Sequence, residues 1–288
     1  MNIPDSIRFA TAAALCAICL MAGCDKAVFP VTDQKLVIDG YIEDGEYPVV
    51  IVTGTIPVSD EFIGLYELDE YVFHWAKVTI SGPDGDFVLT GQKSDKYFPP
   101  YIYTTTNFKG RAGQTYRLTA EYGSARVESE TTIPAHAPSM TLRPESLDDG
   151  SGGYKIVASL KDDPSDRDYY MLLVKVEGRD SVYMPSFMGL INDTILNTEV
   201  SDIPVFPGIH ITADGFSLYY SPGDRVNVKL VTMDEASFKY WSDYHNNMTF
   251  SRNPFFPSSK KMRTNISGGL GLWAGYCSVE QTIYIPEI

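Results

Sequence analysis

Short runs of β-forming residues follow one another along this chain of 288 residues, and turn signals separate them. Residues 36–42 and 47–53 are rich in valine, isoleucine and tyrosine, and the Glu-Asp-Gly-Glu sequence at 43–46 is typical of a hairpin turn. Residues 76–81 alternate apolar and polar side chains up to a Pro-Asp-Gly turn. This spacing predicts a β-sandwich rather than a helical or α/β fold for the first part of the chain.

Four more strands complete the predicted sandwich. They lie at 87–90, 101–106, 115–122 and 125–133. About seven short strands at this spacing favour an immunoglobulin-like or prealbumin-like sandwich over residues 35–134.

A domain boundary is predicted where two prolines, Pro134 and Pro138, bracket small residues without hydrophobic periodicity. Beyond it, residues 139–288 are expected to form a second β domain. Its clearest predicted strands are 154–160, 169–177 and 225–232.

One helix is predicted near 234–248 in this second β domain. Thr232 and Glu235 have capping-box spacing, and Trp241, Tyr244 and Met248 lie on one helical face. We interpret this aromatic stripe as a packing face. The expected fold class is therefore all-β with one amphipathic helix.

The first residues have the pattern of a lipoprotein signal. The apolar run 9–21 is too short to span a membrane, and it leads into Leu-Met-Ala-Gly-Cys at 20–24. We expect a signal peptide at 1–23, lipid attachment with palmitate at Cys24, and a tether at 24–34. An ordinary signal peptide or a buried N-terminal helix is the alternative.

The cysteines and the net charge limit the disulfides that this chain can form and the partners that it can bind. Cys16 and Cys19 leave with the predicted signal peptide, and Cys24 carries the lipid. Cys277 therefore has no intrachain disulfide partner and is predicted to be a buried thiol. The net charge of −14 argues against nucleic acid as a partner. It is compatible with a cationic partner, bound metal ions or solubility alone.

The sequence resembles an uncharacterised lipoprotein family, the domain of unknown function numbered four-two-four-nine. The N-terminal part of the resemblance is the strand pattern at 36–42 and 76–80 after a tether. The more specific part is C-terminal: Asn-Pro-Phe at 253–255 and Asn-Ile-Ser-Gly-Gly-Leu-Gly at 265–271, followed by Trp-Ala-Gly-Tyr at 273–276.

The resemblance implies a lipoprotein of the outer membrane of Gram-negative bacteria, of a kind often encoded beside TonB-dependent transporters. It brings no enzyme activity, no catalytic residue and no cofactor. Surface lipoproteins of these bacteria usually carry several acids after the acylated cysteine. This chain has only Asp25 in Asp-Lys-Ala-Val, so the cell surface and the periplasmic face both stay open.

The glycine-rich segment at 265–271 lacks the Gly-Lys-Ser/Thr ending of a phosphate loop, and no helical pattern follows it. We expect a structural role, in which the glycines allow close backbone approach. Motifs of serine hydrolases and zinc proteases are absent. The histidines at 74, 136, 210 and 245 have no metal-ligand spacing.

Four acids crowd one predicted turn, and they form a weak candidate for a calcium site. They are Asp162, Asp163, Asp166 and Asp168. The pattern lacks the glycine and the distal glutamate of an EF-hand, and Arg167 lies in its middle. An acidic hairpin tip that serves solubility alone is therefore the favoured explanation.

Two loops combine acidic and aromatic residues and form the candidate partner or ligand surface. Their aromatic members are Phe62, Tyr66, Tyr71, Tyr97, Phe98 and Tyr101. Aromatic side chains in loops stack on sugars or anchor a protein partner; alternatively, these cover the joint between the domains.

We therefore expect a non-enzymatic accessory or ligand-binding lipoprotein of the outer membrane that works with a TonB-dependent transporter. Two alternatives remain: an envelope glycan hydrolase with unidentified carboxylates, and an adhesin or structural component of the envelope.

Overall fold

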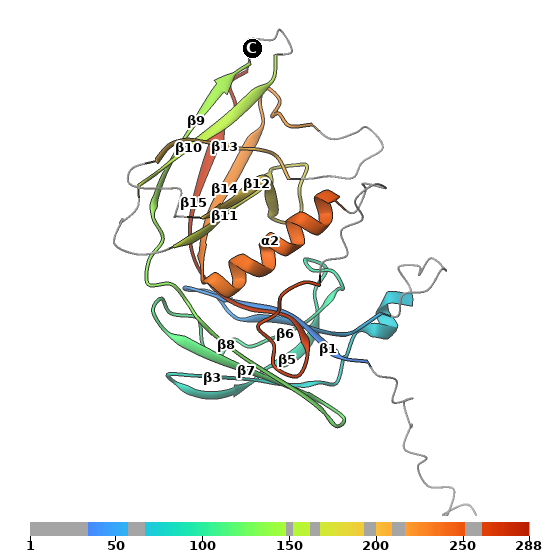
Figure 1. Cartoon of the computed structure of the whole chain (residues 1–288). Coiled ribbons are helices and arrows are strands. Elements are labelled where there is room, and N and C mark those ends of the chain that lie inside the picture. The colour runs from blue at the N-terminus through green and yellow to red at the C-terminus, as the bar shows by residue number, and fades with distance from the viewer. Residues whose placement is uncertain are drawn as a thin grey trace, which may run out of the picture. The chain divides into compact units, whose positions relative to one another are not determined.

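The computed structural model describes residues 34–56, 67–147, 152–161, 168–192, 200–208, 217–250 and 261–287. From Lys35 onward the chain forms one compact unit made mainly of strands, with a single α-helix among the described residues (Figure 1). The all-β, sandwich-like fold class with one helix is thus confirmed.

The strands within the described ranges form three sheets. The largest has eight strands in the order β12-β11-β14-β15-β1-β2-β6-β5: β1 (Leu36–Glu43), β2 (Val49–Gly54), β5 (Thr90–Lys93), β6 (Tyr101–Thr104), β11 (Tyr169–Val176), β12 (Met184–Asn192), β14 (Arg225–Met233) and β15 (Leu270–Tyr284). A four-stranded sheet has the order β4-β3-β7-β8: β3 (Lys77–Gly82), β4 (Gly85–Val88), β7 (Thr115–Tyr122) and β8 (Ala125–Thr132). A three-stranded sheet has the order β13-β10-β9: β9 (Ser139–Ser146), β10 (Tyr154–Lys161) and β13 (Val200–Val205).

The alternation of β1 explains how the first sandwich forms. Leu36, Ile38 and Ile42 are buried in a core that also holds Val78 of β3 and Leu118 of β7. Because successive side chains of a strand point to opposite faces, the odd-numbered residues of β1 lie on the other face of the large sheet.

Strand β15 belongs to both halves of the fold. Its first part pairs with β1 in parallel, and its second part pairs with β14 in antiparallel fashion. Trp273 of β15 is fully buried in the first core, and its Nε1 donates to the Tyr116 carbonyl oxygen at 3.0 Å. Ile283, farther along β15, lies in the second core.

In this respect the structure differs from the predicted division at 134–139. That position lies between β8 and β9, but Ile266, Trp273 and Cys277, assigned by the sequence to the second domain, pack in the core of the first. The physical reason is that β1 pairs with a strand more than 200 residues away, which no local sequence pattern indicates.

A largely buried ion pair lies where the two halves meet. Lys229 of β14 places its Nζ 2.6 Å from Oε1 of Glu43 at the end of β1. The Ser278 hydroxyl of β15 donates to the same carboxylate. These contacts join three strands of the large sheet through one carboxylate.

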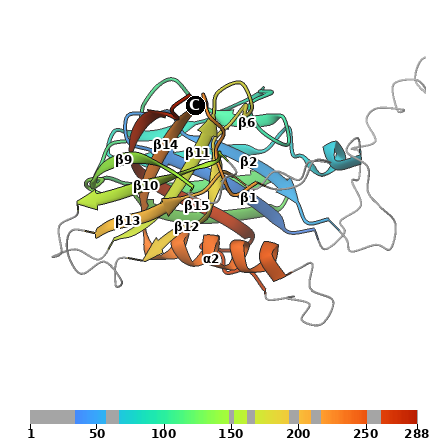
Figure 2. The ribbon, with the colours of Figure 1, turned by 90° about the horizontal axis from the view of Figure 1, so that it is seen from above.

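Helix α2 (Glu235–Phe250) packs on the large sheet, against β11, β12 and β15, and Figure 2 shows it along one side of that sheet. The ring of Phe238 lies 4.8 Å from that of Tyr169, and Trp241 Nε1 donates to the Tyr276 hydroxyl at 3.0 Å. Trp241 thus has the predicted packing role, whereas Tyr244 is exposed.

The helix cap differs from the prediction. Asp234, not Thr232, caps α2: its Oδ1 accepts a hydrogen bond from the Ser237 backbone nitrogen at 2.8 Å. Thr232 is still part of β14, where it is fully buried between paired strands. Among the residues described, no helix has the length and apolar character needed to cross a membrane.

Candidate functional site

A rigid turn before β3 presents the most exposed large aromatic side chain that the structure describes. Trp75 in this turn is 88% exposed. Two tyrosines of β6 form hydrogen bonds with the backbone of this turn. The Tyr103 hydroxyl donates to the Phe73 carbonyl and accepts from the Ala76 nitrogen at 2.8 Å, and the Tyr101 hydroxyl donates to the His74 carbonyl at 3.0 Å.

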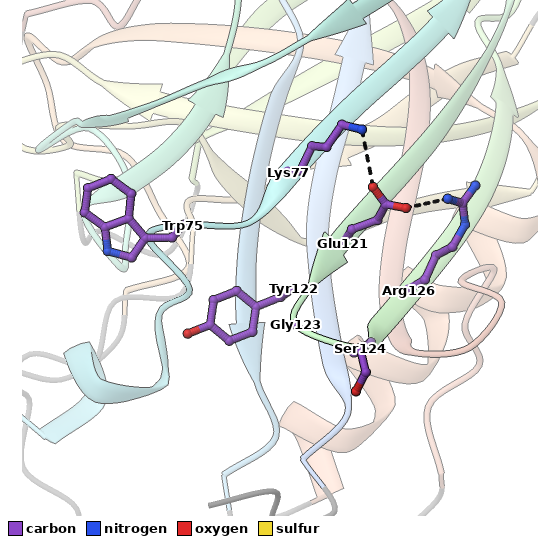
Figure 3. A pocket seen from close by; sticks show the side chains of 8 residues that line it. Trp75, Lys77, Glu121, Tyr122, Gly123, Ser124 and Arg126 are labelled. Carbon is purple, nitrogen blue, oxygen red and sulfur yellow. Dashed lines mark hydrogen bonds and ion pairs between the residues drawn. The ribbon is translucent and has the colours of Figure 1, made fainter. Parts of the chain in front are cut away.

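Trp75 borders an open pocket of about 500 Å³ (Figure 3). The other lining residues come from the start of β3 and from the β7–β8 hairpin: Lys77, Glu121, Tyr122, Gly123, Ser124, Ala125 and Arg126. Tyr122 stacks on Phe73 with the ring centroids 4.3 Å apart, so this part of the pocket is fixed to the same turn that carries Trp75. The hairpin and the turn are therefore coupled by packing.

Charged side chains along the pocket form a balanced network. Glu121 lies between two cations, with Lys77 Nζ at 3.5 Å and Arg126 Nη1 at 2.5 Å (Figure 3). Arg126 also pairs with Glu128 at 2.7 Å. The hydrogen bond from Arg126 lowers the pKa of the Glu121 carboxyl, with the nearby Lys77 adding to the effect.

The lowered pKa of Glu121 makes its carboxyl unsuited to one catalytic role, that of a general acid. A general acid for glycoside cleavage needs a carboxyl whose pKa is raised, and here the neighbouring cations do the opposite. An exposed indole beside fixed, paired charges is instead suited to binding, because it offers apolar area framed by groups that accept and donate hydrogen bonds.

The predicted aromatic surface is only partly brought together. Tyr101 contacts the Trp75 turn through its hydroxyl and through the His74 ring, whose centroid lies 4.4 Å away. Tyr97 instead lies with its hydroxyl 3.1 Å from that of Tyr41, in a separate apolar cluster. Phe98 is 64% exposed.

Of the three remaining residues of the predicted aromatic surface, the structure describes one. Tyr71 ends the 3₁₀ helix η1 (Glu67–Tyr71) and is half-buried, while Phe62 and Tyr66 lie outside the described residues.

Trp75 itself was not among the predicted site residues, although a signal for it exists. In the strand that follows, Ala76, Val78 and Ile80 are buried. Extending this alternation backward puts Trp75 on the outward face together with Lys77. The phase of the strand, rather than loop composition, would have identified the residue.

The glycine-rich segment has the structural role expected of it. Gly271 adopts φ +103, and a Cβ there would lie 1.8 Å from the Ile38 carbonyl oxygen of β1. Asn265 bonds through its side chain to both the nitrogen and the carbonyl of Trp273, at 3.0 and 2.7 Å. The segment thus allows β15 to approach the β1 backbone closely and holds the start of β15 in place.

The other predicted sites are partly outside the description. The residues that the structure describes do not include Cys24, nor three of the four candidate calcium ligands, Asp162, Asp163 and Asp166. Asp168 is described and accepts a hydrogen bond from Tyr170 at 3.3 Å. Within the described ranges, no group of three or more His, Cys, Asp or Glu residues could hold a metal ion. Cys277 is buried, as predicted, and burial raises the pKa of its thiol to about 11.

Comparison with known families supports the resemblance drawn from the sequence. A family model described as a domain of unknown function, DUF4249, matches residues 25–282. None of the curated proteins matches the chain.

Proposed function

This chain belongs to the family of the domain of unknown function DUF4249, and we propose that it is a lipid-anchored, non-enzymatic accessory protein of the outer membrane. In this proposal it docks on a TonB-dependent transporter through the Trp75 pocket. The observation that carries the proposal is the exposure of Trp75 on a turn that two tyrosines hold in place.

The composition of the pocket supports a protein partner. Tryptophan, tyrosine and arginine are the residues that most often dominate binding energy at protein interfaces, and Trp75, Tyr122 and Arg126 all line this pocket. A rigid turn also lowers the entropy lost on binding, because the indole does not need to be ordered by the partner. Lys77 and Glu121 add a charged rim.

The membrane anchor rests on the lipobox that ends at Cys24. A tether of about ten residues at 24–34 would keep the folded unit close to the membrane, where a transporter barrel is within reach.

Co-purification tests the docking role. We expect a β-barrel transporter to be recovered with the wild-type chain from gently solubilised outer membranes, and its recovery to fall at least about tenfold with Trp75→Ala. Tyr284→Ala is the matched control, because Tyr284 is also a highly exposed aromatic residue but lies at the far end of β15. Undiminished recovery of the transporter with Trp75→Ala would overturn docking through this pocket.

The anchor has its own test. Cys24→Ala should leave the chain unacylated, as mass spectrometry of the N-terminal peptide would show, and the protein should be either soluble or retained with residues 1–23 uncleaved. Normal processing and membrane retention of this variant would contradict lipid attachment at Cys24.

A further inference from the structure

The pocket beside Trp75 has an apolar end. Trp75, which is 88% exposed, lines it together with Tyr122, and Figure 3 shows both rings to one side of the charged side chains. Phe73 covers one face of the Tyr122 ring, with the ring centroids 4.3 Å apart, so packing fixes the place of this ring. A ligand that fills this end needs an apolar group to cover the two rings.

The other end of the pocket is charged. Two of the charged side chains that line it are cations, Lys77 and Arg126, and one is the carboxylate of Glu121. Glu128 pairs with Arg126 at 2.7 Å but does not line the pocket. The lining therefore carries one excess positive charge, in a chain whose net charge is −14. This sign favours an anionic group in the ligand.

The hydrogen-bonding groups at this end favour the same kind of ligand. The Glu121 carboxylate already accepts a hydrogen bond from Arg126 Nη1 at 2.5 Å. Lys77 Nζ lies 3.5 Å from Glu121, which is longer than a normal hydrogen bond, and its side chain is 64% exposed. Because an ammonium group has three N–H donors, Lys77 can still donate to a ligand. A ligand carboxylate would accept from it, whereas a ligand ammonium would meet two cations and an acid that is already engaged.

We propose that the Trp75 pocket recognises a carboxylate beside a large apolar side chain, as an acidic segment of a protein presents them. The apolar side chain would cover Trp75 and Tyr122, and the carboxylate would accept hydrogen bonds from Lys77. This inference rests on the proposed docking function, and it specifies the chemistry of the transporter segment that docks here.

Tryptophan fluorescence of the purified full chain reports whether the pocket is occupied. The chain has three tryptophans; Trp273 is fully buried and Trp241 packs between α2 and the large sheet, so Trp75 is the one open to solvent. The probes are the blocked tripeptides Glu-Phe-Glu, Gln-Phe-Gln and Lys-Phe-Lys, which share the apolar residue. We expect Glu-Phe-Glu to shift the emission to shorter wavelength and to bind at least about tenfold more tightly than Lys-Phe-Lys.

Variants measured by isothermal titration calorimetry locate the contact. Lys77→Gln should weaken the binding of Glu-Phe-Glu at least about threefold, since an exposed charge contact is lost. Lys155→Gln is the matched control and should bind as the wild type does. Lys155 is also an exposed lysine paired with a glutamate of the neighbouring strand, Glu145 at 2.9 Å, but it lies in β10. Trp75→Ala should bind none of the peptides measurably.

Equal affinities for Glu-Phe-Glu and Lys-Phe-Lys, or full binding of Glu-Phe-Glu by Lys77→Gln, would refute the carboxylate preference. Binding of cellotriose without binding of any peptide would also refute it and would assign the pocket to a sugar. Transporter recovery separates this inference from the docking function. If recovery falls with Trp75→Ala but the peptides show no charge preference, docking stands and the inference fails. If recovery is unchanged while Glu-Phe-Glu binds at Trp75, docking fails and the carboxylate preference stands.

Discussion

At the scale of single residues, Asp39 works against the stability of the sheet that carries it. Desolvation in the folded protein raises the pKa of this carboxyl in β1 above the ordinary value of 3.8, so the fold holds the carboxyl proton more tightly than the unfolded chain does. The stabilisation that the protonated Asp39 gives to the fold is fully present below pH 3.8, the ordinary pKa. It is lost as the pH rises through the higher pKa of the folded state. At neutral pH the charged form therefore destabilises the fold.

Replacing Asp39 with asparagine should consequently raise the melting temperature at pH 7. The gain should shrink as the pH is lowered toward 4, where the wild-type carboxyl becomes neutral too. Thermal unfolding of the two proteins across this pH range, followed by circular dichroism, measures the difference. A gain that stays constant from pH 7 to pH 4 would mean that charge at Asp39 is not the cause.

Sequence patterns predicted single residues best where burial alone decided their role. Cys277 was expected to be a buried thiol because an apolar, strand-like run surrounds it, and the structure confirms this. Tyr97 was grouped with Tyr101 from loop composition, yet the Tyr97 hydroxyl contacts Tyr41 whereas the Tyr101 hydroxyl bonds to the His74 carbonyl. Composition shows that a residue can bind, but strand phase decides where its side chain lies.

At the scale of elements, helix α2 is tied to the segment before β15 by a buried carboxylate. Asp243 is fully buried in α2 and accepts hydrogen bonds from Arg263 through Nε at 2.6 Å and Nη2 at 2.9 Å. Arg263 also donates to the Lys239 carbonyl at 3.1 Å. The helix therefore depends on a residue that lies beyond its own C-terminal end.

Arg263→Met should lower the free energy of unfolding by about 3 kcal/mol, because it removes the two charge-assisted hydrogen bonds that the guanidinium donates to the buried Asp243 carboxylate. Arg117→Met is the control. It removes an exposed ion pair with Glu130 and should cost less than about 1 kcal/mol. Urea unfolding of the three proteins compares them, and equal losses for the two variants would show that burial of Asp243 is not decisive.

The predicted elements agree with the structure where pattern and turn are both local. The strand at 36–42 and its hairpin correspond to β1 and β2, and the helix predicted at 234–248 corresponds to α2. The helix cap was misplaced by two residues because β14 continues to Met233 and so holds Thr232 in the sheet. Tertiary pairing, which a capping pattern does not register, set that boundary.

At the scale of the whole molecule, β15 makes the stability of one half depend on the other. Its residues pair with β1 of the first sandwich and with β14 of the second. The Glu43–Lys229 pair adds a second link across the same strands. Such shared elements favour a single cooperative unfolding transition.

Gly271→Ala tests this dependence. A Cβ would collide with the β1 backbone at a positive φ, and the expected loss is about 3 kcal/mol. Hydrogen exchange should rise in β10 and β11 as well as in β1. Gly113→Ala has a positive φ but no neighbour within 4 Å, so it should cost only about 1 kcal/mol. Faster exchange confined to the first half in Gly271→Ala would show that the halves unfold independently.

The parallel pairing of β1 with β15 also fixes the order in which the chain can fold during synthesis. The first strand to be made waits for a partner that emerges more than 200 residues later. Parallel strands so distant in sequence close slowly, since the entropy of a long loop is lost before the contacts form. Both cores hold side chains of the final strand, so neither is complete until that strand is available. A chain that lacks β15 therefore cannot complete either core, so the described strands reach their final packing only after residues 270–284 have been made.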